Sequence, residues 1–357
     1  MQPNDFLEAN QSILFEDESW SNFSFFIKQT KASKLFVLVD SNTEIHCLPI
    51  LIGALKAMDR EAVVLNVEAG EKSKDLSVCS QLWSELTAHR ADRHALLINL
   101  GGGMISDLGG FVASIYKRGI DFINIPTSLL GMIDASIGGK CGIDFQHYKN
   151  HLGVFQTALT TFIFPNFLST LPERELRSGF AEAIKHALIK DVNYWKELKN
   201  SSKTSWKASS IIKQSIQIKT DVVANDPLEK GDRKKLNFGH SLGHALESYF
   251  FEKGQAIPHG FAIASGMIME SYISIKKLGL NQESYEEILA FIQSHYELYK
   301  LNDVAVDEII KNLGQDKKNS SGELRFCLLN SIGNAEVDVA VELELIKDSI
   351  ANYRQIK

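Results

Sequence analysis

The chain has 357 residues, of which 44% are hydrophobic and 23% charged, with a formal net charge of −6. Its length predicts two domains, and its acidic balance argues against nucleic acid as a general partner. No apolar run reaches the length of a membrane span, and the N-terminal MQPNDFLEAN lacks the basic and apolar regions of a signal peptide. The four cysteines are scattered and form no CxxC pair, which is typical of reduced thiols, so we expect a cytoplasmic protein.

The first half of the chain alternates short apolar runs with segments of helical period. Runs rich in β-branched residues predict strands at residues 34–40, 62–67, 95–100 and 122–127. Residues 76–86 have helical spacing, and this alternation predicts βαβ units around a mainly parallel sheet. Ligands of such sheets bind at the carboxyl ends of strands, where Asp40, the glycines 101–103 and Thr127 fall.

The segment from residue 99 to 155 is dense in glycine, with charged residues between the glycine clusters. Glycine is costly inside helices and strands, so the clusters indicate close approach of the backbone to a ligand or a neighbour. The run LLINLGGG predicts a buried strand that ends in a glycine turn, where backbone N–H groups can bind a nucleotide diphosphate. The pattern is not GxGxxG, and for GGG alone a tight turn without a ligand is an equal alternative.

After about Pro172 helical spacing dominates the chain. Helices are predicted at residues 175–189, 207–223, 260–277 and 283–298, and a short hairpin at residues 323–339. The fold class is therefore predicted as α/β plus all-α. A Rossmann-like domain with a mainly parallel sheet is expected at residues 1–171, and a mostly helical metal- and substrate-binding domain at residues 172–357.

A candidate metal site lies in the helical half. The motif NFGHSLGHALE places His240 and His244 four residues apart, on one face of a helix. This spacing is common among metal ligands, although the glutamate of HExxH is missing. A third histidine, His259, follows a proline at a predicted helix start. Spacing alone does not choose which two of the three histidines bind.

A carboxylate candidate is Glu182, in the helix GFAEAIKHALI, whose inner face is otherwise apolar. An acidic residue there is costly unless it is paired or bound to a metal. Two histidines and one carboxylate would suit zinc with an open coordination position. The alternative is a salt bridge from Glu182 to Lys185 or His186, which have the required spacing on a helix.

Taken together, a series of motifs resembles 3-dehydroquinate synthase, a family of sugar phosphate cyclases, and the resemblance covers nearly the whole chain. The motifs are GGGMISDLGGF, YKRG, PTSLLGMIDASIGGK, YKNHLGVF, LPERELRSGFAEAIKH, DRKKLNFGHSLGHALE, PHGFAIASG and DKKN. The resemblance implies an N-terminal domain that binds NAD and a helical domain that binds a divalent metal. It also implies an active site in the cleft between them, and a homodimer.

The resemblance further implies roles for individual residues. The metal, zinc or cobalt, would be bound by Glu182, His240 and His259, with His244 beside the substrate instead. NAD-contacting positions would be Asp40, Glu71, Lys74, Gly102, Gly103, Met104, Asp107, Thr127, Ser128, Leu130, Lys149 and Thr170. Substrate-contacting positions would be Arg118, Asp134, Lys140, Asn150, Lys185, Lys219, Arg233, Asn237, Lys317 and Lys318. The expected catalytic residues are Lys140, Lys185, Arg233, Asn237 and His244, and Arg118 would reach the phosphate from a neighbouring subunit.

The activity implied by the resemblance converts 3-deoxy-D-arabino-heptulosonate 7-phosphate into 3-dehydroquinate and phosphate, with NAD regenerated in each cycle. An inosose-forming cyclase, a metal-dependent polyol dehydrogenase and a non-catalytic NAD-binding protein are the alternatives. A candidate carboxylate-binding set of Lys219, Arg233 and a lysine of the DKKN motif favours 3-dehydroquinate synthase over another cyclase. The GGK and AExIKH patterns argue against the polyol dehydrogenase, and the intact metal and cation sets argue against the non-catalytic protein.

Two positions depart from the commoner family pattern. Asp144 stands in GIDF where asparagine is common, and Tyr148 precedes Lys149 where glycine is common. Both departures fall between the glycine cluster and the KN pair, and they leave the matched charged residues intact.

Overall fold

The computed structural model describes residues 12–15, 17–146, 148–316 and 324–356. It divides into two compact units, the first formed by the chain up to Pro172 together with Lys207–Thr220, the second by Glu173–Trp206 and the chain from Asp221 onward. The predicted domains, residues 1–171 and 172–357, differ from these units in the segment 207–220, which belongs to the first unit. Helical spacing does not say which unit a helix packs on, and here Lys213 lies 4.7 Å from the centre of the Phe15 ring.

The first unit is built on a six-stranded parallel sheet in the order β1-β8-β5-β4-β2-β3. Its strands are β1 (Ser12–Phe15), β2 (Leu35–Asp40), β3 (Ala62–Val67), β4 (Leu96–Gly101), β5 (Asp121–Pro126) and β8 (Thr160–Ile163). The predicted mainly parallel sheet is therefore confirmed, with β1 and β8 as strands that the pattern did not indicate. The strand order reverses between β2 and β4, which is where ligands bind in such sheets.

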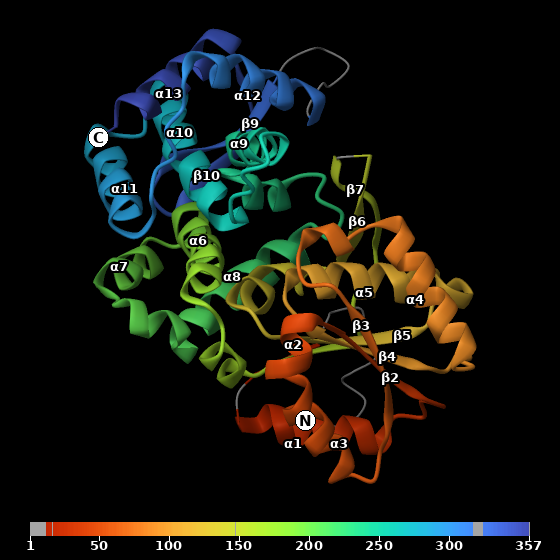
Figure 1. Cartoon of the computed structure of the whole chain (residues 1–357). Coiled ribbons are helices and arrows are strands. Elements are labelled where there is room, and N and C mark those ends of the chain that lie inside the picture. The colour runs from red at the N-terminus through yellow and green to blue at the C-terminus, as the bar shows by residue number, and fades with distance from the viewer. Residues whose placement is uncertain (1–11, 16, 147, 317–323, 357) are drawn as a thin grey trace. The chain divides into compact units, whose positions relative to one another are not determined.

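Helices cover both faces of this sheet. They are α1 (Asp17–Gln29), α2 (Ser41–His46), α3 (Leu48–Lys56), α4 (Leu76–Ala88) and α5 (Gly103–Ile115). Figure 1 shows α1 and α3 on one face of the sheet and α4 and α5 on the other. The predicted helix at residues 76–86 is confirmed as α4.

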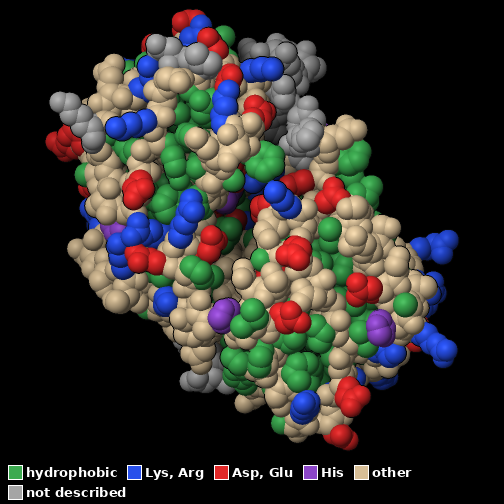
Figure 2. All heavy atoms as spheres, in the orientation of Figure 1, with side chains coloured by type: hydrophobic (Ala, Val, Ile, Leu, Met, Phe, Trp, Pro, Cys, Tyr) green, Lys and Arg blue, Asp and Glu red, His purple; other side chains and the backbone are tan. Residues whose placement is uncertain are grey.

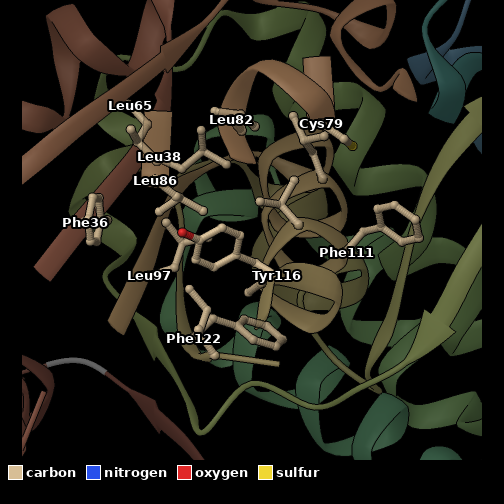
Figure 3. Close-up of a cluster of buried hydrophobic side chains, with 14 of the residues drawn as sticks. Phe36, Leu38, Leu65, Cys79, Leu82, Leu86, Leu97, Phe111, Tyr116 and Phe122 are labelled. Carbon is tan, nitrogen blue, oxygen red and sulfur yellow. The ribbon is translucent and has the colours of Figure 1, made fainter. Parts of the chain in front are cut away.

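The core between the sheet and α4 follows from strand alternation. Phe36 and Leu38, two positions apart on β2, face the same side and meet Leu82 and Leu86 of α4, with Leu97 from β4 beside them (Figure 3). These five side chains are at most 1% exposed. Each contributes roughly 1.5–3 kcal/mol by burial, which fixes the strand ends that carry the candidate site.

A second, antiparallel sheet in this unit was not predicted. It pairs β6 (Lys140–Phe145) with β7 (Tyr148–Phe155), with an irregular register between Ile143 and Phe145. Glycines and charged residues interrupt the apolar alternation here, so the strand signal is hidden. The hairpin carries Lys140, Lys149 and Asn150 of the predicted sites.

The second unit is mostly helical, as predicted. Its elements are α6 (Glu173–Lys190), α7 (Val192–Asn200), α9 (His240–Glu252), α10 (His259–Leu278), α11 (Gln282–His295), α12 (Asp303–Asp316), β9 (Leu324–Ser331), β10 (Asn334–Val341) and α13 (Leu343–Gln355). Helix α8 (Ser209–Asn225) runs from the first unit into the second. The buried α10 packs against α6, α9, α11, α13 and β9, so it is the central support of this unit.

The surface mixes charges of both signs. On the face shown in Figure 2, Lys and Arg side chains lie among Asp and Glu side chains. Several cations of the predicted sites are instead buried, with exposed fractions of 7% or less: Lys74, Lys185, Lys219 and Arg233. Within the described ranges, no helix is both long and apolar enough to cross a membrane.

Candidate cofactor and metal sites

The first candidate site lies where β4 runs into α5. Gly101 ends β4, Gly102 is the N-cap of α5, and Gly103 is its first residue. As a glycine, the N-cap Gly102 has no side chain with which to cap this helix start. A Cβ on Gly102 would lie 3.2 Å from the hydroxyl of Ser128, so a bare backbone suits this position. A helix N-terminus whose N-cap has no side chain, at the carboxyl end of a central parallel strand, fits the diphosphate of NAD.

Beside this turn, Lys74 joins two other predicted residues. Its Nζ lies 2.6 Å from Asp107 Oδ2 and 2.5 Å from Asn150 Oδ1. Burial alone would lower the pKa of Lys74, but attraction by Asp107 and neighbouring carboxylates outweighs it and raises the pKa. Asp144 accepts from Asn150 N at 2.8 Å and donates its own N–H to Lys74 O at 2.8 Å. This departure from the family pattern thus supports the cluster.

The other predicted residues of the first unit are placed separately. Asp40 accepts at 2.9 Å from the N–H groups of Asn42 and Thr43, which caps α2. Asp134 forms an ion pair with Lys219 at 2.5 Å. Thr127 is buried; Met104, Ser128 and Leu130 are half-buried; Glu71, Arg118, Lys140, Lys149 and Thr170 are exposed.

Three helices of the second unit bring the candidate metal ligands together. Glu182 Oε1, fully buried on α6, lies 3.6 Å from His240 Nε2 and 3.5 Å from His259 Nε2. One ring nitrogen each of His240, His244 and His259 lies within 4.8 Å of the others. Imidazole nitrogens and a carboxylate are the donors that zinc and cobalt accept, so the residues fit a divalent ion. Because all three histidines converge, the choice of His240 and His259 over His244 stays a prediction.

The second nitrogen of each predicted histidine ligand has its own partner. His240 Nδ1 lies 3.1 Å from Phe238 O, and His259 Nδ1 lies 3.4 Å from Glu247 Oε2. Such contacts fix the ring and leave Nε2 to face Glu182, as in metal sites whose outer partners orient the ligands. Glu247 was not predicted, although HALE places it three residues after His244 on the same helix.

The carboxylates of this cluster attract positive charge, either a proton on His259 or a metal ion that displaces it. Burial lowers the pKa of His240 well below its ordinary value, so the ring is neutral, as a metal ligand must be. Burial opposes the charged form of His259 too, but Glu182 and Glu247 outweigh it and raise its pKa to about 9. Glu182 also forms a buried ion pair with Lys185, so the salt bridge weighed against a metal role occurs together with the histidine contacts.

The junction between α6 and α10 sets the spacing of Glu182 and His259. Ser178, one turn before Glu182, accepts a hydrogen bond of 3.0 Å from Gly260 N through its hydroxyl. A Cβ on Gly260 would lie 1.9 Å from Ser178 O, so only glycine allows this approach. Ser178 was not predicted.

The predicted substrate residues Arg233 and Asn237 lie in the short helix η7 (Asp232–Asn237). Arg233 is 1% exposed and donates to Pro227 O at 2.6 Å. Asn237 donates to Glu229 Oε1 at 2.9 Å, and Glu229 was not predicted. Lys317 and Lys318 lie outside the described residues.

Comparisons with known proteins assign both halves of the chain to one family. Residues 64–178 match the family model "3-dehydroquinate synthase N-terminal", and residues 179–319 match "3-dehydroquinate synthase C-terminal". The chain is 37% identical over 350 residues to 3-dehydroquinate synthase of Parabacteroides distasonis, covering 97% of this chain and 99% of the relative. It is 38% identical over 316 residues to that of Clostridium beijerinckii, covering 87% and 89%.

A solved structure extends the comparison to three dimensions. The 2-epi-5-epi-valiolone synthase of Streptomyces hygroscopicus subsp. jinggangensis 5008, with NAD⁺ and Zn²⁺ bound, superposes with a TM-score of 0.85. It is 26% identical, and the match covers 97% of both chains. Because the family models match both halves of its sequence and the named relatives match nearly its whole length, the chain belongs to the 3-dehydroquinate synthase family.

Proposed function

We propose that this enzyme converts 3-deoxy-D-arabino-heptulosonate 7-phosphate into 3-dehydroquinate and phosphate, with NAD and a divalent metal, zinc or cobalt. The observation that carries the proposal is the buried Glu182 carboxylate within 3.6 Å of His240 and His259, paired with the buried Lys185. A metal-binding cluster and a cation in one place suit an anionic, hydroxyl-rich substrate. Relatives that bear the name of this activity match nearly the whole chain, which supports the same assignment.

Different residues of the chain would bind NAD and the metal. The start of α5 at Gly102 would hold the NAD diphosphate, with the charged Lys74 beside it. Glu182, His240 and His259 would hold the metal. When bound, NAD supplies reversible hydride transfer, and the metal supplies polarisation of the hydroxyl that is oxidised.

The substrate carries a phosphate and a carboxylate, so a protein of net charge −6 must supply local cations. Lys185, Lys219 and Arg233 are at most 7% exposed, which makes their hydrogen bonds to anionic groups strong. Asp134, Lys140, Asn150, Asn237 and His244 are proposed to position the hydroxyls and to handle protons there. We also propose a homodimer in which the exposed Arg118 reaches the phosphate of the neighbouring site.

The test is phosphate release from the heptulosonate phosphate by the purified enzyme. We expect release that is lost with EDTA and restored by Zn²⁺ or Co²⁺, without accumulation of NADH. Stoichiometric NADH would indicate a polyol dehydrogenase. Turnover of glucose 6-phosphate in place of the heptulosonate phosphate would indicate an inosose-type cyclase.

A further inference from the structure

Helix α9, which carries His240 and His244, begins without a side-chain cap from its own segment. Its N-cap is Gly239, in the left-handed region with φ 78, and His240 is its first residue. N–H groups at a helix start have no acceptor within the helix. Here α10 supplies one, because the Glu270 carboxylate accepts from Gly239 N at 2.7 Å and from Leu242 N at 3.0 Å.

The two helices meet backbone to backbone at this point. A Cβ on Gly266 would lie 2.0 Å from Gly239 O, and a Cβ on Gly239 would lie 2.5 Å from Met267 Cγ. A Cβ on either glycine would therefore clash, so the close approach of α9 and α10 requires glycine at both positions. Glu270 follows Gly266 by one turn of α10, so its carboxylate reaches the start of α9.

Because Glu270 is buried, its hydrogen bonds to α9 hold the first turn of that helix in one place. Glu270 is 0% exposed, and its negative charge at the positive end of the α9 dipole is favourable. Moving the first turn of α9 would leave N–H groups and a carboxylate poorly paired in a low-dielectric interior. The first turn includes His240, whereas α10 itself begins with His259.

We propose that Glu270 is a positioning residue for the metal centre. Through the backbone of α9 it holds His240 against α10, at the distance from His259 that a shared divalent ion requires. The inference rests on the proposed metal site and adds a residue to it that lies outside the motifs of the ligands. Outer partners of this kind commonly change metal affinity 10- to 100-fold.

The test compares Glu270→Gln with Ser274→Ala in the full chain. Gln keeps the size of the side chain and removes its charge. Ser274, one turn further along α10, donates to Glu270 O at 2.7 Å and accepts from Leu329 N at 2.9 Å, so S274A loosens α10 on β9 instead. We expect both variants to melt at lower temperature. Only E270Q should bind Co²⁺ about 10- to 100-fold more weakly, with an altered d–d absorption spectrum.

The Co²⁺ titrations distinguish failure of the positioning role of Glu270 from failure of the proposed metal site. Parent-like Co²⁺ affinity and spectrum in E270Q would overturn the positioning role and leave Glu270 as a stabilising cap. Failure of the parent protein to bind Co²⁺ would instead overturn the metal site itself. If circular dichroism shows that E270Q does not fold, Glu270→Asp, which keeps the charge but shortens the reach, is titrated against the same criteria.

Discussion

Replacing Lys185 with methionine is expected to tighten metal binding while it abolishes turnover. Lys185 and Glu182 form an ion pair with side chains that are 1% and 0% exposed. The same carboxylate lies 3.5 Å from His259, so the ammonium group of Lys185 and the proposed divalent ion would compete for it. Methionine keeps the length of the side chain and removes the competing charge, together with the cation proposed to bind the substrate.

The size of the effect on stability follows from the burial of the pair. Removing one partner of a buried ion pair costs about 3–5 kcal/mol, whereas replacing both with apolar or neutral groups is often close to neutral. In EDTA, Glu182→Gln and Lys185→Met should therefore each lower the free energy of unfolding by about 3–5 kcal/mol. The double variant should lose less than their sum, with a coupling on the order of 3 kcal/mol.

The assays are urea denaturation followed by circular dichroism, Co²⁺ titration, and phosphate release. Lys190→Met is the matched control, because Lys190 is exposed on the same helix, and its effect on stability should stay within about 0.5 kcal/mol. Weaker Co²⁺ binding by K185M would refute the competition for Glu182. Additive losses in the double variant would refute the coupling within the pair.

Three further predictions concern the first unit. Gly102→Val should abolish NAD binding in calorimetry without changing the circular dichroism spectrum, because a branched side chain blocks the diphosphate; parent-like affinity would place the diphosphate elsewhere. Mixing Arg118→Ala with Lys140→Ala should restore part of the phosphate release, since each heterodimer has one intact site; inactive heterodimers would place Arg118 in its own chain's site. Burial raises the pKa of Cys79 and of Cys141 to about 12, which lowers their thiolate fraction, so these thiols should react with a disulfide reagent only after unfolding; rapid labelling of the native protein would contradict this.

Elements with a regular apolar period were predictable, and elements without one were not. The predicted strand at residues 62–67 is β3, and the helical spacing at residues 260–277 lies within α10. The β6–β7 hairpin was missed because glycines and charges break its alternation. Its geometry depends instead on contacts such as Asp144 to Asn150, which join residues across the hairpin.

The candidate ligands were predictable for a similar reason, since their residue types are informative within short motifs. His240 and His244 share a helix face by spacing alone, and the structure brings the other two candidates, His259 and Glu182, beside them. Spacing in the sequence does not determine which two of the three histidines bind the metal. The convergence of all three rings leaves that choice to experiment.

The partners of the residues that support the metal ligands could not be predicted from local sequence. An acidic residue on an apolar helix singled out Glu182, and the same signal is present at Glu270 in GMIMESY and at Glu247 in HALE. The three carboxylates nevertheless do different things: Glu182 faces two histidines and a lysine, Glu247 faces the far nitrogen of His259, and Glu270 accepts from the backbone of α9. The partners of Glu270 lie 28 and 31 residues earlier in the chain, where no local pattern connects them. A buried acid therefore predicts that a polar partner exists, because its charge must be compensated, whereas only the packing of helices decides whether that partner is a cation, an imidazole or a helix start.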